Sequence, residues 1–272
     1  TAAYSRTQQF AQSLRNAESV AGHVFPADLD IGAGVAGVPV PQSEQLVVAA
    51  EWAPAAGIRW GAQAFARRME DLVLVAPRED GPFARAAFDI GSATARGAAM
   101  ELASSGARHG AVVSYGWQRV RIAYGDSAYT PRYGTAHTVD TGVIVFPSST
   151  AALRASLSAG FGRSATLLSG PFEWEACNLL DRGCEFAGSP GLAGPPGAAT
   201  LPAYVRLDVG ARKHWHVELG GRDVLLGVFG TITNMLGRRN TLAHVVDPDT
   251  GESRAVHMLP RAPLVLGIDT RF

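Results

Sequence analysis

The chain has 272 residues, and its 24 basic and 24 acidic side chains balance, which argues against a nucleic-acid partner or an acidic target surface. The sequence has no run of the roughly 18 uncharged apolar residues that a membrane helix needs. Its 31 glycines and 16 prolines fit short strands joined by turns, and a hydrophobic content of 47% is compatible with a membrane barrel of alternating strands.

Apolar residues recur at about every second position in nine segments, and this period predicts β-strands; residues 2–10 are a plausible first strand with a weak pattern. The pattern is clear in 151–162, where leucines, alanines and Phe161 share one face and Arg154, serines and glycines share the other. In chain order the predicted strands are 2–10, 43–52, 58–75, 93–104, 110–122, 135–146, 151–162, 201–213, 222–234 and 262–272.

Two of these segments are ambiguous in pattern. The alanine content of 58–75 also permits a helix, but its aromatic and β-branched residues favour a strand. In 110–122 the alternation changes after Trp117, because Arg119 and Arg121 fall on the apolar face. Either the strand continues beyond the hydrocarbon there, or a β-bulge shifts its faces.

The connections between the predicted strands alternate strictly between short and long. The short ones are predicted at 53–57, 105–109, 147–150 and 214–221. The long ones are predicted as loops at 11–42, 76–91, 123–134, 163–200 and 235–261. Short turns at one rim and long loops at the other are typical of outer-membrane barrels.

The last predicted strand ends the chain with an apolar face and an aromatic residue. That face carries Leu264, Leu266, Ile268, Thr270 and Phe272. It resembles the closing strand of bacterial outer-membrane barrels. The fold class we expect is all-β, an antiparallel up-and-down transmembrane β-barrel, in which about ten strands form a small closed barrel or an arc of a larger one. If Phe272 lies on the periplasmic side, every long loop is extracellular.

Cysteine usage and the chain start give two further expectations. Cys177 and Cys184 lie close together in the longest loop, and we expect a small disulfide that persists outside the cell. The sequence starts at Thr1 without a signal peptide, so we expect a processed or truncated product.

Charged residues on the faces opposite the apolar stripes are candidates for the barrel lumen. They are Glu51, Glu101, Asp140, Arg154, Arg206, Asp208, Arg212, Asp269 and Arg271. A solvated, mutually paired interior is the simplest interpretation, because isolated buried charge is costly. The functional alternative is that some of them line a substrate path or bind a plug.

Arginine accounts for 23 of the 24 basic residues, and Lys213 is the one lysine. A GC-rich genome explains this bias most simply. The alternative is that guanidinium groups suit a charged lumen or lipid phosphates.

Aromatic residues on the presumed lipid faces are candidates for girdles at the membrane interfaces, the alternative being an ordinary sheet core. They are Trp52, Trp60, Tyr115, Trp117, Phe161 and Phe272.

Motifs for catalysis or metal binding are weak. His214, His216 and Glu218 share a face of an extended segment, but no fourth metal ligand is evident. The sequence has no Gly-x-Ser-x-Gly elbow, and Asp247 and Asp249 alone do not make a calcium loop. We therefore predict no catalytic residues, no metal and no cofactor.

Several C-terminal segments resemble TonB-dependent outer-membrane receptors. They are YVRLDVGARKHW, GGRDVLLGVFGTITNMLGRRN, VVDPDTGE and MLPRAPLVLGIDTRF. The family's Asn-Leu-Phe-Asn-like segment corresponds loosely to Thr233–Asn240, with Met-Leu-Gly in place of the usual core. Upstream, ARGAAMELAS is similar to the family's Arg-Gly-x-Glu strand, with Ala99 where an acid is common and Glu101 kept.

The resemblance implies that residues 1–272 form the C-terminal portion of a receptor barrel without its plug domain, since such transporters have 22 strands. It implies TonB-dependent uptake of a scarce nutrient, of the siderophore, cobalamin or glycan class. The expected partners are outer-membrane lipid and lipopolysaccharide, a small-molecule ligand, and the TonB system through N-terminal parts. The alternatives are a small outer-membrane barrel with an enzymatic site at its rim, a passive pore or adhesion barrel, and a soluble β-sandwich.

Overall fold

The computed structural model describes most of the chain. The described residues are 1–14, 29–32, 37–75, 88–131, 136–169, 191–247, 250–258 and 263–271. Cys177, Cys184 and Phe272 lie outside them, so the disulfide and the C-terminal aromatic residue stay predictions.

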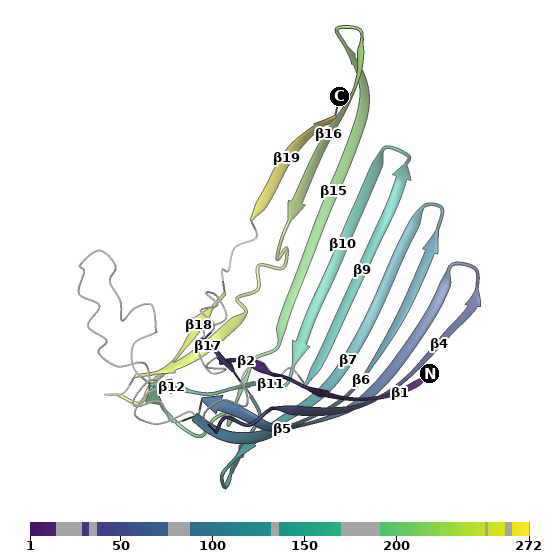
Figure 1. The fold of residues 1–272 in the computed structure, drawn as a ribbon. Helices are drawn as coiled ribbons and strands as arrows, with labels where there is room; N and C mark the ends of the chain where they lie inside the picture. Colours follow the sequence, from purple (N-terminus) through teal and green to yellow (C-terminus); the bar gives the residue numbers. More distant parts are fainter. Residues whose placement is uncertain are drawn as a thin grey trace.

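One antiparallel sheet dominates the described residues and confirms the ten predicted strands (Figure 1). Its order is β1-β4-β5-β6-β7-β9-β10-β15-β16-β19, which is also the order along the chain, and β8 pairs with β7. The strands are β1 (Ala2–Gln8), β4 (Gln42–Ala55), β5 (Ile58–Val75), β6 (Phe88–Gly106), β7 (His109–Tyr124), β8 (Ser127–Tyr129), β9 (His137–Ser148), β10 (Ala151–Phe161), β15 (Tyr204–Leu219), β16 (Arg222–Ile232) and β19 (Leu264–Arg271).

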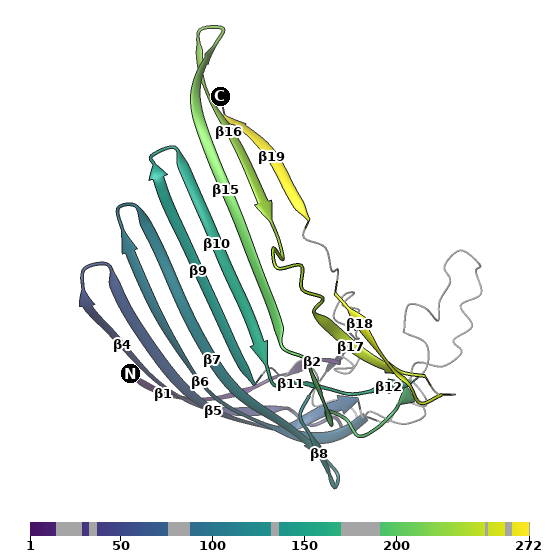
Figure 2. The same cartoon turned by 180° about the vertical axis from the view of Figure 1, so that it is seen from behind.

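The sheet is a single curved layer with two open edges. Within the described residues β1 and β19 each pair with one neighbour in it, so the strands form an arc and do not close. Figure 2 shows the same layer from behind. None of the described segments is a helix that could cross a bilayer.

Two-residue turns join the hairpins at one end of the sheet, at 56–57, 107–108, 149–150 and 220–221 (Figure 1). The predicted turn at 214–221 is too long, because β15 continues to Leu219. Trp215 pairs there with Leu226, and Gly220 and Gly221 both have positive φ, at 59° and 75°. Such a turn matches the strand twist, so the hairpin needs no longer connection.

The ambiguous segments are both strands. Residues 58–75 form β5, which is bulged between Met69 and Leu72. The pairing of β6 with β7 runs without a register shift from Gly91 to Gly106, so the bulge suggested for β7 is absent. Arg119 and Arg121 therefore lie on the same face as Trp117.

The long connections contain short strands where loops were predicted. β2 (Ala11–Leu14) pairs with β3 (Leu29–Gly32), and β11 (Arg163–Ala165) pairs with β14 (Ala199–Leu201). A four-stranded sheet has the order β13-β12-β17-β18, with bounds Gly191–Leu192, Leu168–Ser169, Thr241–Val246 and Ser253–His257. Backbone groups of long connections need partners, and these short pairings supply them.

A cluster of buried hydrophobic residues lies outside the main sheet. Ala243 and Val245 of β17 are buried and pack with Leu242 and Val256. In the main sheet, by contrast, Leu153 is 50% exposed and Leu266 is 70% exposed. No second layer of described residues covers the apolar face, which excludes the β-sandwich for this part of the chain.

Candidate functional site: the charged face of the sheet

Cross-strand pairing places the predicted lumen residues on one face, which we call the charged face. Residues directly opposite each other in adjacent strands point to the same side. One row of such partners crosses seven strands, from Glu51 through Gly61, Glu101, Ser114, Asp140 and Ser158 to Arg206. Arg154, Asp208, Arg212, Asp269 and position 271 follow on the same face by the alternation of their strands. Whether this face lines a lumen stays a prediction.

Ion pairs join some of these charges between strands. Arg59 Nη2 lies 3.1 Å from Glu101 Oε1, and Arg212 Nη2 lies 2.5 Å from Asp269 Oδ2. Exposed pairs of this kind contribute little stability, about 0–1 kcal/mol each. They show instead that the charges of this face are partly matched.

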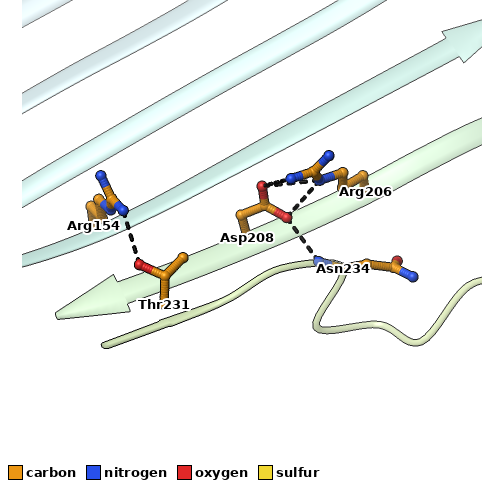
Figure 3. A network of polar contacts seen from close by, with 5 residues as sticks. All are labelled: Arg154, Arg206, Asp208, Thr231 and Asn234. Atoms are coloured by element: carbon orange, nitrogen blue, oxygen red, sulfur yellow. Dashed lines mark hydrogen bonds and ion pairs between the residues drawn. The ribbon is translucent and has the colours of Figure 1, made fainter. Parts of the chain in front are cut away.

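Asp208 is the centre of the best-connected group (Figure 3). Its carboxylate accepts hydrogen bonds from Arg206 Nε at 2.8 and 3.0 Å, and Arg206 Nη2 lies 2.7 Å from Oδ2. The backbone N–H of Asn234 donates to Asp208 Oδ1 at 2.8 Å. Asp208 therefore ties the segment that follows β16 to β15.

Asn234 is held in an unusual conformation beside this carboxylate. Its φ is 49°, in the left-handed region that asparagine tolerates, and its side chain is buried. Its Nδ2 donates to the carbonyl of Arg238 at 3.1 Å, whereas its Oδ1 has no hydrogen-bond partner among the described residues. The chain turns sharply at this point instead of extending β16.

Arg154 reaches across a whole strand to its partner. It lies on β10, and its Nη2 donates to Thr231 Oγ1 of β16 at 2.9 Å, passing over β15 (Figure 3). Gly210 is the β15 residue between them, and a Cβ there would lie 2.8 Å from Arg154 Nε. The absence of a side chain at Gly210 is what allows this contact.

An open groove of about 650 Å³ lies along this part of the charged face. Its polar lining includes Arg154, Ser156, Asp208 and Thr231, whereas residues such as Val112 and Ile144 make most of the lining apolar. Guanidinium, hydroxyl and carboxylate groups side by side can bind a polar small molecule by hydrogen bonds. They do not form a nucleophile–base pair.

The opposite face carries the described residues among the predicted girdle aromatics, and we call it the apolar face. Trp52 pairs with Trp60 on it, and Trp117 shares a row with His137 and Phe161. Tyr115 Oη and His137 Nδ1 are 2.7 Å apart. Trp52 is 64% exposed, so this belt does not belong to a protein core.

Sequence reasoning missed several residues that hold the site together. Thr231 and Arg59 partner predicted charges, but only the register of the strands shows that they come within reach of them. Asn240 ends the segment that resembles the receptor motif, and its side chain accepts from Val205 N and donates to Val205 O at 3.0 and 2.9 Å. Asn240 lies in the predicted loop 235–261, and a polar residue in a loop is only a weak sequence signal for such a role.

His214, His216 and Glu218 share the charged face of β15, as predicted, but they lie along one strand. Among the described residues no group of three potential ligands could hold a metal ion.

Comparison with known proteins gives a likeness of fold. No protein-family profile and no curated protein matches the sequence. Among solved structures, the ferric-catecholate import receptor Fiu of Escherichia coli K12 is similar with a TM-score of 0.55 and 12% identity, over 98% of this chain and 32% of that one.

Two other solved structures are similar at lower TM-scores. The outer-membrane transporter YddB of Escherichia coli has a TM-score of 0.39 and 9% identity, over 86% of this chain and 32% of that one. The alcaligin outer-membrane receptor FauA of Bordetella pertussis has values of 0.36 and 15%, over 99% and 39%. This chain thus spans about a third of the length of these proteins. The likeness to Fiu shows that the single-layer arc is a fold found in an outer-membrane receptor.

Proposed function

We propose that this chain is the C-terminal portion of an outer-membrane receptor barrel that takes up a scarce nutrient. One observation carries the proposal: a single-layer sheet exposes large apolar side chains on one face and charged side chains on the other. In water the apolar face has no cover, but in a bilayer the hydrocarbon covers it and the charged face borders an aqueous interior.

The long connections are the proposed ligand-capturing surface. They lie at the end of the sheet opposite the two-residue turns (Figure 1). We place them outside the cell and the turns on the periplasmic side. The small sheets of β11–β14 and β12–β18 give this end a folded platform from which recognition residues can project.

The ligand class is a siderophore, cobalamin or glycan, and the resemblance of the C-terminal segments supports energy supply by the TonB system. That coupling requires a plug and a TonB-interacting segment in addition to the sheet described here. The likeness to a ferric-catecholate import receptor makes an iron chelate the first ligand to test. We assign no enzymatic activity to the chain.

Uptake and conductance distinguish a receptor from a passive pore. Cells that produce the full-length protein should accumulate a radiolabelled iron chelate, cobalamin or oligosaccharide, and collapse of the proton-motive force should abolish that uptake. Removing residues 170–190, which leaves β12 and β13 intact, should weaken ligand binding. Uptake that survives the collapse, together with steady single-channel conductance, would support the pore instead.

The two faces can be tested independently of any ligand. With Cys177 and Cys184 replaced by serine, a spin label at position 153 should be more accessible to oxygen, and one at position 154 to a water-soluble nickel complex. A matched pair on β16 is 228 and 229, where Val228 lies on the apolar face and Phe229 on the charged face. Equal accessibility at both positions of each pair would contradict a bilayer location.

A further inference from the structure

The apolar face changes character near the long-connection end of the sheet. Along β7 it carries Val113, Tyr115 and Trp117 and then Arg119 and Arg121. On the same face β6 carries Arg96 in the row of Arg119. In the row of Arg121, β5 carries Arg68 and β1 carries Arg6, with Glu44 of β4 between them. These arginines, which we call the arginine patch, are Arg6, Arg68, Arg96, Arg119 and Arg121.

Acidic residues compensate only part of this charge. Glu44 lies 3.6 Å from Arg6, and Glu70 lies 2.6 Å from Arg68. Among the described residues no acidic side chain forms an ion pair with Arg96, Arg119 or Arg121, and all three are exposed.

Two of the exposed arginines face each other directly. Arg96 of β6 is the cross-strand partner of Arg119 of β7, and Arg121 lies one row further along β7. Directly opposite side chains have Cβ atoms about 4.5–5.5 Å apart, and like charges at that separation destabilise a sheet. The arrangement is therefore unfavourable unless an anion lies between the two guanidinium groups.

The patch also has space for such an anion. A groove of about 600 Å³ lies among Arg68, Arg96, Arg119 and Arg121, and the small residues Ala66 and Thr94 and the acidic Glu44 also line it. Guanidinium groups bind phosphate oxygens in pairs, and a phosphate bridging two arginines satisfies both forks.

The position of the patch identifies the source of the phosphate. Trp117 and Tyr115 lie next to it on the same face, and aromatic residues of membrane proteins lie at the depth of the lipid headgroups. Arg119 is two residues beyond Trp117, about 7 Å further along the strand, beyond the hydrocarbon boundary.

We propose that the arginine patch binds the phosphate groups of lipid A, the phosphorylated glycolipid of the outer leaflet. The site rests on the proposed orientation, which places the long connections outside the cell. Arg96 and Arg119 hold one phosphate between them, and Arg68 and Arg121 flank it. The acyl chains extend along the apolar rows of β4 to β7.

The test compares the unfolding free energy of the full-length protein in phosphatidylcholine vesicles with and without bisphosphorylated lipid A. The native protein should be stabilised by lipid A. The double variant Arg96→Gln/Arg119→Gln should lose that stabilisation, and its affinity for lipid A should fall at least about tenfold. Without lipid A the same variant should be at least as stable as the native protein, because the repulsion is removed.

A matched control removes two exposed arginines outside the patch. Arg108→Gln/Arg239→Gln should keep the response to lipid A. Equal loss in both double variants would overturn the site, since net charge alone would then explain binding.

Measurements on the native protein keep the proposal testable if the variant fails to fold. Dephosphorylated lipid A should not stabilise the protein, and high salt should weaken the response to the phosphorylated form. Equal stabilisation by both forms, or by inorganic pyrophosphate, would overturn the assignment to lipid phosphate. If the native protein lies in the outer membrane but shows no response to lipid A, only this site is refuted, whereas a location elsewhere refutes the proposed function.

Discussion

Asp208 is the residue on which the contacts of the charged face converge. Its carboxylate is shared by the Arg206 guanidinium and the Asn234 backbone N–H. Asp208→Ala should lower the unfolding free energy by about 1–2 kcal/mol, because it leaves a charge and a backbone donor without their partner. Urea titration of the protein in lipid vesicles measures this loss.

Asp140 supplies the matched control on the same face. It is exposed, and its side chain makes no hydrogen bond or ion pair with other described residues. Asp140→Ala should change the unfolding free energy by less than about 0.5 kcal/mol. Amide exchange at Asn234 should accelerate in the Asp208 variant only, and similar exchange in both variants would contradict the tether.

Which charges share a face could be predicted from alternation alone, and the cross-strand rows agree with the predicted set. Their partners could not, because a partner depends on how adjacent strands are staggered. Arg154 is an example: its contact with Thr231 requires a glycine on the intervening strand. Nothing in the local sequence around Arg154 encodes that requirement.

At the scale of elements, Gly210 links three strands. A Cβ there would meet Arg154 Nε at 2.8 Å and Thr231 Oγ1 at 3.1 Å. Gly210→Val should therefore displace Arg154 and destabilise the folded protein by about 1–3 kcal/mol, despite the strand preference of valine. Gly61 lies on the same face, and a Cβ at that position would have nothing within 4 Å, so Gly61→Val should be nearly neutral. Denaturant unfolding measures both variants. Equal losses of unfolding free energy in the two would show that the contact of Arg154 across β15 is unimportant.

The two faces of β10 should differ in their tolerance of charge. Leu157 lies opposite Thr141 and Leu207 on the apolar face, and Ser156 lies opposite Gly142 and Asp208 on the charged face. Leu157→Arg should cost roughly 2–4 kcal/mol at mid-strand, because the proposed location puts this side chain in the hydrocarbon. Ser156→Arg should cost far less, because water and Asp208 can accommodate it. Similar losses in vesicle-based unfolding would contradict lipid contact by the apolar face.

Strand ends and the short strands were the elements that pattern predicted least well. β15 extends through His214 and His216, whose polarity resembles that of a turn, because the hairpin closes on Gly220 and Gly221. β17 has the alternation of a strand in TLAHVV, but it lies within a segment dominated by turn residues. Tertiary pairing with β12 and β18 decides its conformation.

At the scale of the whole molecule, orientation can be tested with inserted epitopes. An epitope after Gly251, in the exposed turn between β17 and β18 at the long-connection end (Figure 1), should be accessible to antibody on intact cells. An epitope after Gly220, in the turn at the opposite end, should become accessible only after permeabilisation. Immunofluorescence with the reverse pattern would invert the orientation and move the arginine patch to the inner leaflet.

Closure of the barrel is the global property that the sequence could not supply. Alternation defines the two faces and turn residues define the hairpins, but closure requires the first and last strands to meet in register. The described residues leave β1 and β19 as edges. A closed small barrel and an arc of a larger one have the same local pattern, so only the assembled sheet separates them.

The four hairpins β4–β5, β6–β7, β9–β10 and β15–β16 are each closed by a two-residue turn and follow one another along the chain. Each hairpin can therefore be duplicated or deleted as a unit. Such a change adds or removes two strands of the sheet and leaves the charged and apolar faces of the other strands unchanged. Recombination within a hairpin that adds or removes one residue of a strand would instead exchange the two faces of that strand. Ancestral enlargement or shrinkage of such a wall should thus have occurred in even steps.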